Sequence, residues 1–185
     1  MNDNLQFLQQ RNSAPRLTAP APSDQQLAEM LKAALRAPDH AWLRPWRFIA
    51  IAGERRADFG LVLEQALLQR NPDADEAACS KARNAPLRAP LILVATVELT
   101  EHPKVPHAEQ RLSAGCAAYA ILLAADAMGF AGVWRTGDPA FDRKVMNALD
   151  LSPDEEIIGF IYLGTREGKA KPLPALSTAD FVSNW

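Results

Sequence analysis

The most apolar stretch of the chain, residues 113–128, is predicted to form a central buried helix. Apolar side chains occupy nearly every face of a helix drawn over these residues, which is typical of a helix buried all round. Ser113 is a candidate N-cap, and Gly129 suits the left-handed conformation just past a last turn. Alanines recur there at three- and four-residue steps, so another backbone can approach closely. Two interpretations stay open: a core helix within one subunit, or a core helix that also packs against its symmetry mate in a dimer.

Other hydrophobic periods predict further helices and strands. Apolar positions at three- and four-residue spacing predict helices over residues 24–37, 54–69 and 139–149. A further helix, polar and peripheral, is expected over residues 75–84. Alternating or continuous apolar runs predict strands over residues 47–52, 89–97, 130–137 and 156–164. The run at 89–97 is continuous, which indicates burial on both faces. Ser23 is the expected N-cap of the helix over residues 24–37. The order of elements alone suggests a doubly wound α/β fold.

The last segment, about residues 169–185, is predicted to be an extended arm. It contains two prolines and several large apolar side chains: Leu173, Leu176, Phe181, Val182 and Trp185. An extended segment with this many apolar side chains needs a surface against which to bury them. A partner subunit is the natural candidate for that surface.

Composition and charge narrow the class of protein. The 185 residues are 48% hydrophobic and 23% charged, and the net charge of −2 gives no electrostatic case for nucleic acid binding. No segment suits a membrane span, and the N-terminus has no signal-peptide pattern. Cys79 and Cys116 form no CxxC motif, and Cys116 is predicted to be an apolar filler of the buried helix. These features favour a cytoplasmic protein without nucleic acid or membrane partners.

Two segments have the composition of an anion-binding turn. Arg11, Ser13 and Arg16 combine positive charge with a hydroxyl and are candidates to hold a phosphate, although a solvated surface turn has the same composition. Glycines flank a second turn at 132–137, where Arg135 can bind phosphate oxygens through its planar guanidinium group.

A proline-bounded loop gathers charged and aromatic side chains: Arg36, His40, Trp42 and Trp46. A lone histidine is usually a structural residue, but this combination favours a stacking or ligand site. The other two histidines and the glutamates near them have no known ligand spacing, so no metal site is expected.

Seven motifs occur in a characteristic order. They are Arg11-Asn12-Ser13 with Arg16, RAPDH at 36–40 with Pro-Trp at 45–46, KARNAP at 81–86, KVP at 104–106, SAGCA at 113–117, GVWRTG at 132–137, and IGFIYLGT at 158–165. None is specific alone. Together they resemble the nitroreductase superfamily, and within it the minimal YdjA-like NAD(P)H nitroreductases, from about residue 5 to the C-terminus.

The resemblance implies an α+β nitroreductase-like fold in which helices flank a central mixed sheet. It implies an intertwined homodimer with two FMN sites at the interface. It also implies a single domain over residues 1–185, whose C-terminal arm (about 169–185) lies over the partner subunit.

The resemblance further assigns residues to cofactors. FMN contacts are implied for Arg11, Asn12, Ser13, Trp134, Arg135 and Thr136, and for Arg36 and His40 of the opposite subunit. A contact with NAD(P) is implied for Ala124, Ala125, Asp126, Ala127, Met128 and Gly129, although this segment is predicted to be buried. Two departures from the family pattern stand out. Asn12 lacks the usual second positive charge, and Arg44 replaces a glutamine and is a candidate to restore it.

The implied activity is hydride transfer from NAD(P)H through FMN to a nitroaromatic, quinone or similar small acceptor, in ping-pong order. No catalytic side chain is needed because the flavin carries the chemistry. Arg16 or Arg36 is expected to stabilise the anionic reduced flavin. The alternatives are another FMN chemistry on the same fold, such as dehalogenation or flavin cleavage, and a non-enzymatic FMN-binding protein.

Overall fold

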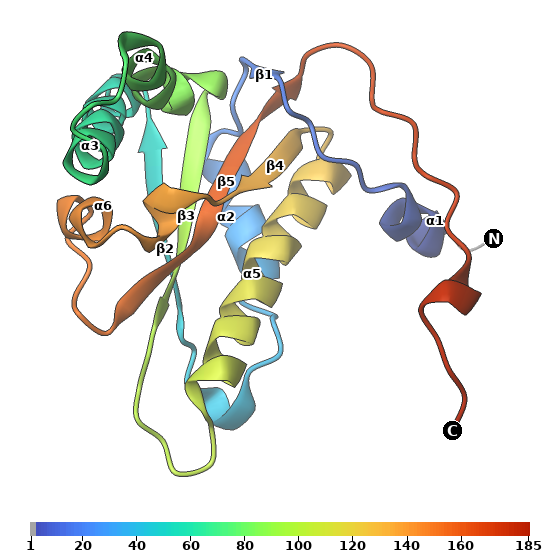
Figure 1. Ribbon diagram of the computed structural model, residues 1–185. Coiled ribbons are helices and arrows are strands. Elements are labelled where there is room, and N and C mark those ends of the chain that lie inside the picture. The colour runs from blue at the N-terminus through green and yellow to red at the C-terminus, as the bar shows by residue number, and fades with distance from the viewer. Residues whose placement is uncertain (1–2) are drawn as a thin grey trace.

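A five-stranded sheet forms the centre of the computed structural model, which describes residues 3–185 (Figure 1). Its strands are β1 (Leu17–Thr18), β2 (Trp46–Ala52), β3 (Leu91–Glu98), β4 (Ala131–Arg135) and β5 (Glu155–Arg166). They lie in the order β1-β5-β3-β2, and β4 also pairs with β5. All pairings between the described strands are antiparallel.

The strand directions correct two expectations. The doubly wound α/β fold suggested by the order of elements is wrong, because β5 runs antiparallel to both β3 and β4. The α+β class is confirmed, but the mixed sheet is not found within the described residues of one chain, where only antiparallel pairs occur. Hydrophobic periodicity marks a strand and says nothing about its direction, which explains the first error.

Six helices are described, and all but the first cover a face of the sheet. They are α1 (Asp3–Gln10), α2 (Asp24–Ala34), α3 (Arg55–Arg70), α4 (Glu76–Asn84), α5 (His107–Ala127) and α6 (Arg143–Ala148). Short 3₁₀ turns lie between these elements or in the C-terminal segment: η1 (His40–Trp42), η2 (Ala85–Arg88), η3 (Asp138–Phe141) and η4 (Thr178–Asp180). Helices α3, α4 and α6 lie on one face, and α2 and α5 lie on the other (Figure 1).

Strand β3 contributes to the cores on both faces. Ile92 and Val94 pack into the core with α3 and α6, whereas Leu91, Leu93 and Ala95 pack into the core with α2 and α5. Each is at most 4% exposed. This alternation follows from the two-residue period of a strand, and it confirms the prediction that the strand is buried on both faces.

Helix α5 begins earlier and is less enclosed than expected. It starts at His107 after Pro106, so Ser113 is an interior residue whose hydroxyl donates a hydrogen bond to the Pro38 carbonyl at 2.6 Å. The N-cap assignment was wrong because the charged first turns break the apolar pattern but are still helical. Leu112 and Tyr119 are 69% and 42% exposed, and Cys116 is also exposed, so burial all round is wrong for the single chain.

Two polar side chains fix helix starts elsewhere. Ser23 accepts a hydrogen bond from the Gln26 N–H and completes a capping box, as predicted for α2. The helix expected over 139–149 is divided instead into η3 and α6. The Asp142 carboxylate caps α6 by accepting a hydrogen bond from the Lys144 N–H, and it thereby starts a new helix within the predicted one.

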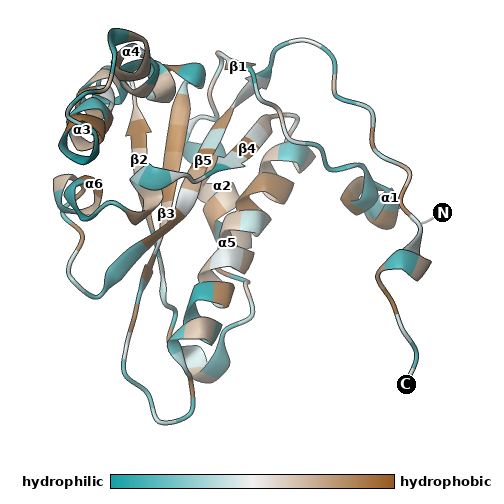
Figure 2. Cartoon of the chain, viewed as in Figure 1, coloured by the Kyte–Doolittle hydropathy of each residue, from teal (hydrophilic) through white to brown (hydrophobic). Residues whose placement is uncertain are grey.

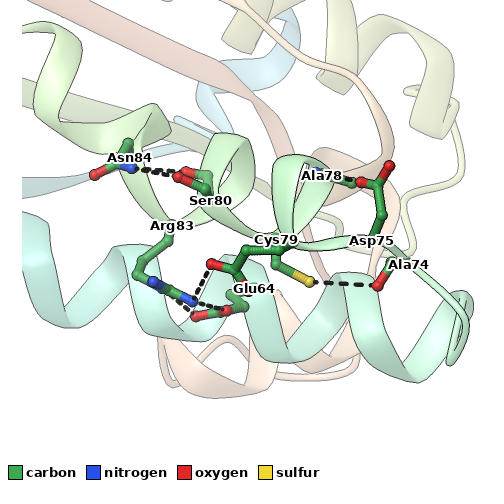
Figure 3. A network of polar contacts seen from close by, with 9 residues as sticks. Glu64, Ala74, Asp75, Ala78, Cys79, Ser80, Arg83 and Asn84 are labelled. Carbon is green, nitrogen blue, oxygen red and sulfur yellow. Dashed lines mark hydrogen bonds and ion pairs between the residues drawn. The ribbon is translucent and has the colours of Figure 1, made fainter.

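Helices α3 and α4 pack side by side, with an ion pair between them (Figure 3). A Cβ atom on Gly60 would lie 2.1 Å from the Arg83 carbonyl oxygen, so only glycine permits this approach. Arg83 Nε donates to Glu64 Oε2 at 2.6 Å, and a second hydrogen bond makes the contact bidentate. The Arg83 hydrogen bond lowers the pKa of Glu64 below its ordinary value.

Two arms leave the body at one corner of the sheet. Helix α1 and the segment after β5 extend away from the other elements (Figure 1), and residues 167–185 are all exposed. Apolar residues interrupt the polar ones along both arms (Figure 2). The arms are held at their roots by the β1–β5 pairing and by a 2.5 Å hydrogen bond from Asn12 Nδ2 to the Lys171 carbonyl. The prediction of a largely extended C-terminal arm is confirmed.

Candidate functional site

A cavity of about 430 Å³ opens beside the turn between β4 and η3, and we call it the turn cavity. Its lining residues come from α3, η2, β4, β5 and the turn: Phe59, Leu63, Ala85, Arg88, Trp134, Arg135, Thr136, Gly137, Pro139, Phe160 and Tyr162. Among these described residues there are two guanidinium groups, four aromatic rings and no carboxylate. The turn cavity therefore suits a ligand with an aromatic body and negative charge.

The end of β4 directs two side chains to different neighbours. Trp134 lies against β5, where a Cβ atom on Gly159 would come within 2.0 Å of the indole Nε1. The Arg135 guanidinium lies over the Tyr162 ring at 5.4 Å. Arg135 Nε is buried and has no hydrogen-bond partner among the described residues. A buried donor left unpaired is costly, so this nitrogen is a strong candidate to bind an acceptor atom of a ligand.

The electrostatics of the turn cavity are positive. Burial raises the pKa of Tyr162, and the charges of Arg135 and Arg88 partly oppose that rise. The phenol therefore stays protonated at neutral pH and can donate a hydrogen bond. Sequence reasoning did not single out Arg88 or Tyr162. The available signal was a lone hydroxyl-bearing side chain in an otherwise apolar strand, IIGFIYLG.

The N-terminal segment runs along β4 and brings its polar residues toward the same region. The Ala14 N–H donates to the Gly132 carbonyl at 3.0 Å, and Arg135 Nη2 donates to the Pro15 carbonyl at 3.3 Å. Just before Ala14, Arg11 Nη1 lies 3.4 Å from Ser13 Oγ. A guanidinium beside a hydroxyl is a good donor pair for a phosphate.

Asn12 and Arg16 are placed differently from Arg11 and Ser13. The Asn12 amide is engaged by the Lys171 carbonyl, and the Asn12 carbonyl accepts from Arg166 Nη2 at 3.0 Å. Asn12 therefore ties the N-terminal segment to the C-terminal arm. The Arg16 residue is exposed, and its carbonyl accepts from the Glu167 N–H at 3.2 Å.

A second cavity, of about 440 Å³, lies in the loop between α2 and β2, and we call it the loop cavity. It is lined by Leu35, Arg36, Ala37, Asp39, Trp42, Arg44 and Trp46. His40 is not among its lining residues, and its Nδ1 lies 2.7 Å from Glu109 Oε2. The predicted cluster of charged and aromatic residues is thus brought together, except for the histidine.

Within one chain, Arg36 and His40 do not join Arg11, Ser13 and Arg135. The first two residues belong to the loop region and the other three to the N-terminal segment and β4. The resemblance implied that the two sets meet across a dimer interface, and this stays a prediction.

The segment implied for NAD(P) is the last turn of α5 and its C-terminal cap. Ala125 is fully buried, Asp126 is half-buried, and the three residues after it are exposed. Ala124 is partly buried, so the expectation that this segment is buried is right for Ala125 and wrong for the last three residues. Gly129 has φ +80°, which confirms its predicted role after the last turn.

The described residues contain no group of three or more potential metal ligands, and none of their helices has the length and apolar character needed to cross a membrane.

Comparison with known proteins identifies the family. The model of the nitroreductase family matches residues 8–165, so the chain belongs to that family. A relative from Escherichia coli K12, "Putative NAD(P)H nitroreductase YdjA", is 46% identical over 168 residues, which are 91% of each chain. A "Putative NAD(P)H nitroreductase" from Haemophilus influenzae is 38% identical over 184 residues, 98% of each chain.

Solved structures share the fold at lower sequence identity. A nitroreductase-like protein from Bacillus cereus has a TM-score of 0.83 at 18% identity and covers 98% of this chain and 95% of its own. A nitroreductase with bound FMN from Bacteroides fragilis has a TM-score of 0.74 at 19% identity, and the full length of both chains is covered. These likenesses confirm the nitroreductase-like α+β fold.

Proposed function

We propose that the protein is an FMN-dependent NAD(P)H oxidoreductase that passes hydride from NAD(P)H through FMN to nitroaromatics, quinones or similar small acceptors. The observation that carries the proposal is the buried, unpaired Arg135 Nε beside an aromatic cavity without carboxylates. The names of the two curated relatives and the FMN in a structural neighbour support the same assignment.

The chain's residues fit an FMN molecule. Arg11, Ser13 and Arg135 supply cationic and hydroxyl donors for the phosphate, and Trp134 and Thr136 border the cavity for the ring system. Asn12 is left out of the phosphate site because its amide already donates to Lys171. Arg36 and His40 would approach the flavin from the partner subunit.

When bound, FMN would supply the hydride chemistry. The protein's part is to bind, to orient and to adjust electrostatics. Arg16 or Arg36 would place positive charge where the reduced flavin carries its negative charge. The exposed end of α5, from Ala127 to Gly129, would contact the nicotinamide nucleotide. Donor and acceptor would use one open face in turn, which gives ping-pong order.

We propose a homodimer because large apolar side chains lack a covering surface within the described chain. They lie on α1, on one face of α5 and along the C-terminal arm: Leu5, Leu8, Leu112, Tyr119, Leu173, Leu176, Phe181, Val182 and Trp185. A second copy of the chain would bury these groups together. The arm from about residue 169 would then lie over the partner.

The purified protein tests the proposal directly. We expect a flavin absorption spectrum, stopped-flow reduction of the bound flavin by NADH or NADPH, and reoxidation by a nitroaromatic or quinone. Bound flavin that neither nucleotide reduces would favour the non-enzymatic alternative. Absence of flavin after reconstitution with FMN would overturn the proposal.

Sedimentation velocity tests the dimer separately. We expect a dimer at micromolar concentration, and truncation after Gly168 should weaken the dimer and release flavin. A stable monomer that retains its flavin would contradict the proposed assembly.

A further inference from the structure

The loop cavity has more positive charge and aromatic surface than the proposed contact of Arg36 with the flavin accounts for. It combines the guanidinium groups of Arg36 and Arg44 with the indoles of Trp42 and Trp46, against one carboxylate, that of Asp39. Trp42 is 78% exposed, whereas Trp46 is 6% exposed and belongs to a core. The loop cavity therefore presents one free aromatic face beside excess positive charge.

The backbone of this loop is held in an unusual conformation. Ala41, Trp42 and Arg44 have φ values of +58°, +57° and +50°, in the left-handed region that residues other than glycine rarely adopt. Such conformations persist only where the surroundings impose them, and they cluster at functional sites. Here the Arg44 N–H donates to Asp39 Oδ2 at 2.9 Å, and the Arg44 carbonyl accepts from Arg47 Nη1 at 2.8 Å.

The Arg44 side chain lies against Trp42 and is not neutralised by an ion pair. Its guanidinium lies 5.8 Å from the centre of the Trp42 ring, a cation–π contact. In residues 3–185 no carboxylate forms an ion pair with Arg44 or Arg36. The Asp39 carboxylate instead uses one oxygen for the Arg44 backbone. By contrast, nearby Arg47 is paired with Glu98 at 2.5 Å.

We infer that Arg44 and Trp42 select planar aromatic acceptors that carry a carboxylate or similar anionic group. The ring of the acceptor would stack against Trp42, and its anionic group would accept hydrogen bonds from Arg44, whose planar fork matches a carboxylate. The inference rests on the proposed function for the ligand's role as electron acceptor. The binding preference follows from the loop cavity alone.

A matched pair of ligands tests the preference. We would measure the binding of 4-nitrobenzoate and its neutral isostere 4-nitrobenzamide to the purified full-length protein by calorimetry, without a nicotinamide donor so that no turnover occurs. We expect wild type to bind the anion about 10-fold or more tighter than the amide, as a charge-assisted hydrogen bond predicts.

Variants assign the preference to its residues. Arg44→Gln should reduce the anion-to-amide ratio to about one, and Arg44→Lys should retain part of it because the charge remains. The backbone hydrogen bonds of residue 44 persist in both variants, and circular dichroism checks that they fold. Arg55→Gln removes an 83% exposed arginine at the start of α3 and should leave the ratio unchanged. Trp42→Ala should weaken both ligands alike.

The outcomes separate this inference from the proposed function. Equal binding of the two ligands to wild type, or an unchanged ratio in Arg44→Gln, would overturn the role of Arg44. Failure to reduce either nitro compound with NADH or NADPH would count against the proposed function, and the binding ratio would still decide the selectivity of the loop cavity. If both the proposed function and the binding preference are confirmed, kcat/KM should be higher for 4-nitrobenzoate than for 4-nitrobenzamide, and Arg44→Gln should remove that difference.

Discussion

Arg11 is the residue whose replacement tests the phosphate site most directly. Its guanidinium lies 3.4 Å from Ser13 Oγ, in the segment that Arg135 contacts through Pro15. A hydrogen bond to a charged group contributes roughly 1.5–3 kcal/mol, so Arg11→Ala should weaken FMN binding about 10-fold or more. Riboflavin lacks the phosphate and should lose little affinity. Fluorescence titration of both flavins checks this, and equal losses would remove Arg11 from the phosphate site.

Gly159 is predicted to be required by the Trp134 indole. A Cβ atom there would lie 2.0 Å from Trp134 Nε1, so Gly159→Ala must displace the ring or β5. Overpacking of this kind typically costs about 1–3 kcal/mol, and the displaced turn should also bind flavin less well. Urea unfolding and near-UV circular dichroism measure the two effects.

Gly115→Ala provides the matched control for Gly159→Ala. Its Cβ would lie 3.8 Å from Trp134 Cη2, an ordinary contact with the same ring. Alanine also suits the interior of α5 better than glycine, by up to about 1 kcal/mol. The control should therefore be neutral or stabilising, and comparable destabilisation by both variants would show that the indole does not need the space above Gly159.

Residue types in the sequence indicate which side chains could bind a ligand. They do not indicate which of those side chains already form hydrogen bonds within the protein. The motifs singled out Arg135 and Thr136, and both line the turn cavity. They equally singled out Asn12, whose amide is instead bonded to Lys171, 159 positions away. Arg88 and Tyr162 were missed for the same reason. The pairing of β4 with β5 places Tyr162 beside the turn, and packing of η2 adds Arg88 to the same cavity; local spacing indicates neither.

At the scale of elements, the packing of α4 on α3 should depend on pH. The hydrogen bond from Arg83 lowers the pKa of Glu64 below its ordinary value of 4.5. The unfolded state then binds a proton more readily than the folded state, so the stabilisation is present above the ordinary pKa and is lost as pH falls through the lowered one.

Comparison with Glu64→Gln isolates this pH dependence. The free energy of unfolding of wild type should exceed that of Glu64→Gln from pH 7 to about pH 5 and converge with it at more acidic pH. Urea titrations at several pH values measure the difference. Glu29→Gln removes the exposed Glu29–Lys32 pair and should change stability by about 0.5 kcal/mol or less. A constant difference between wild type and Glu64→Gln would contradict the assigned pKa shift.

The elements themselves were largely predictable, but their ends were less so. The strand at 89–97 was found within two residues because its continuous apolar run has no competing period. The predicted start of α5, residue 113, lies six residues after the observed start at His107. The first turns of the helix carry charged side chains that interrupt the apolar pattern. One of them, Arg111, pairs with Glu156 at 2.7 Å. The split at Asp142 was missed because a capping aspartate leaves the apolar period intact.

At the scale of the whole molecule, local patterns did not determine how the strands connect. Alternating helices and strands suggested a parallel sheet, whereas every pairing between described strands is antiparallel. The resemblance supplied the α+β class that periodicity could not. The extended C-terminal arm was predictable from its prolines and large apolar side chains. A segment this short cannot form a hydrophobic core of its own.

The proposed dimer predicts that one flavin site draws residues from two subunits. Arg11 and Arg36 lie in separate parts of one chain, and the family resemblance brings them together only across the interface. A mixed dimer of an Arg36→Ala subunit and an Arg11→Ala subunit then contains one site with both arginines intact and one site with both removed. Such heterodimers should recover about half of wild-type activity, although both homodimers are impaired.

Differently tagged subunits, co-expressed and purified through both tags, allow the mixed dimer to be isolated and its activity and flavin content measured. Wild-type subunits carrying the same two tags control for the tags and the purification. A mixed dimer that binds one flavin per dimer and has about half the activity supports sites shared between subunits. If the mixed dimer is no more active than the average of the two homodimers, Arg11 and Arg36 act on the flavin from the same chain or not at all, because only a shared site can become intact by mixing.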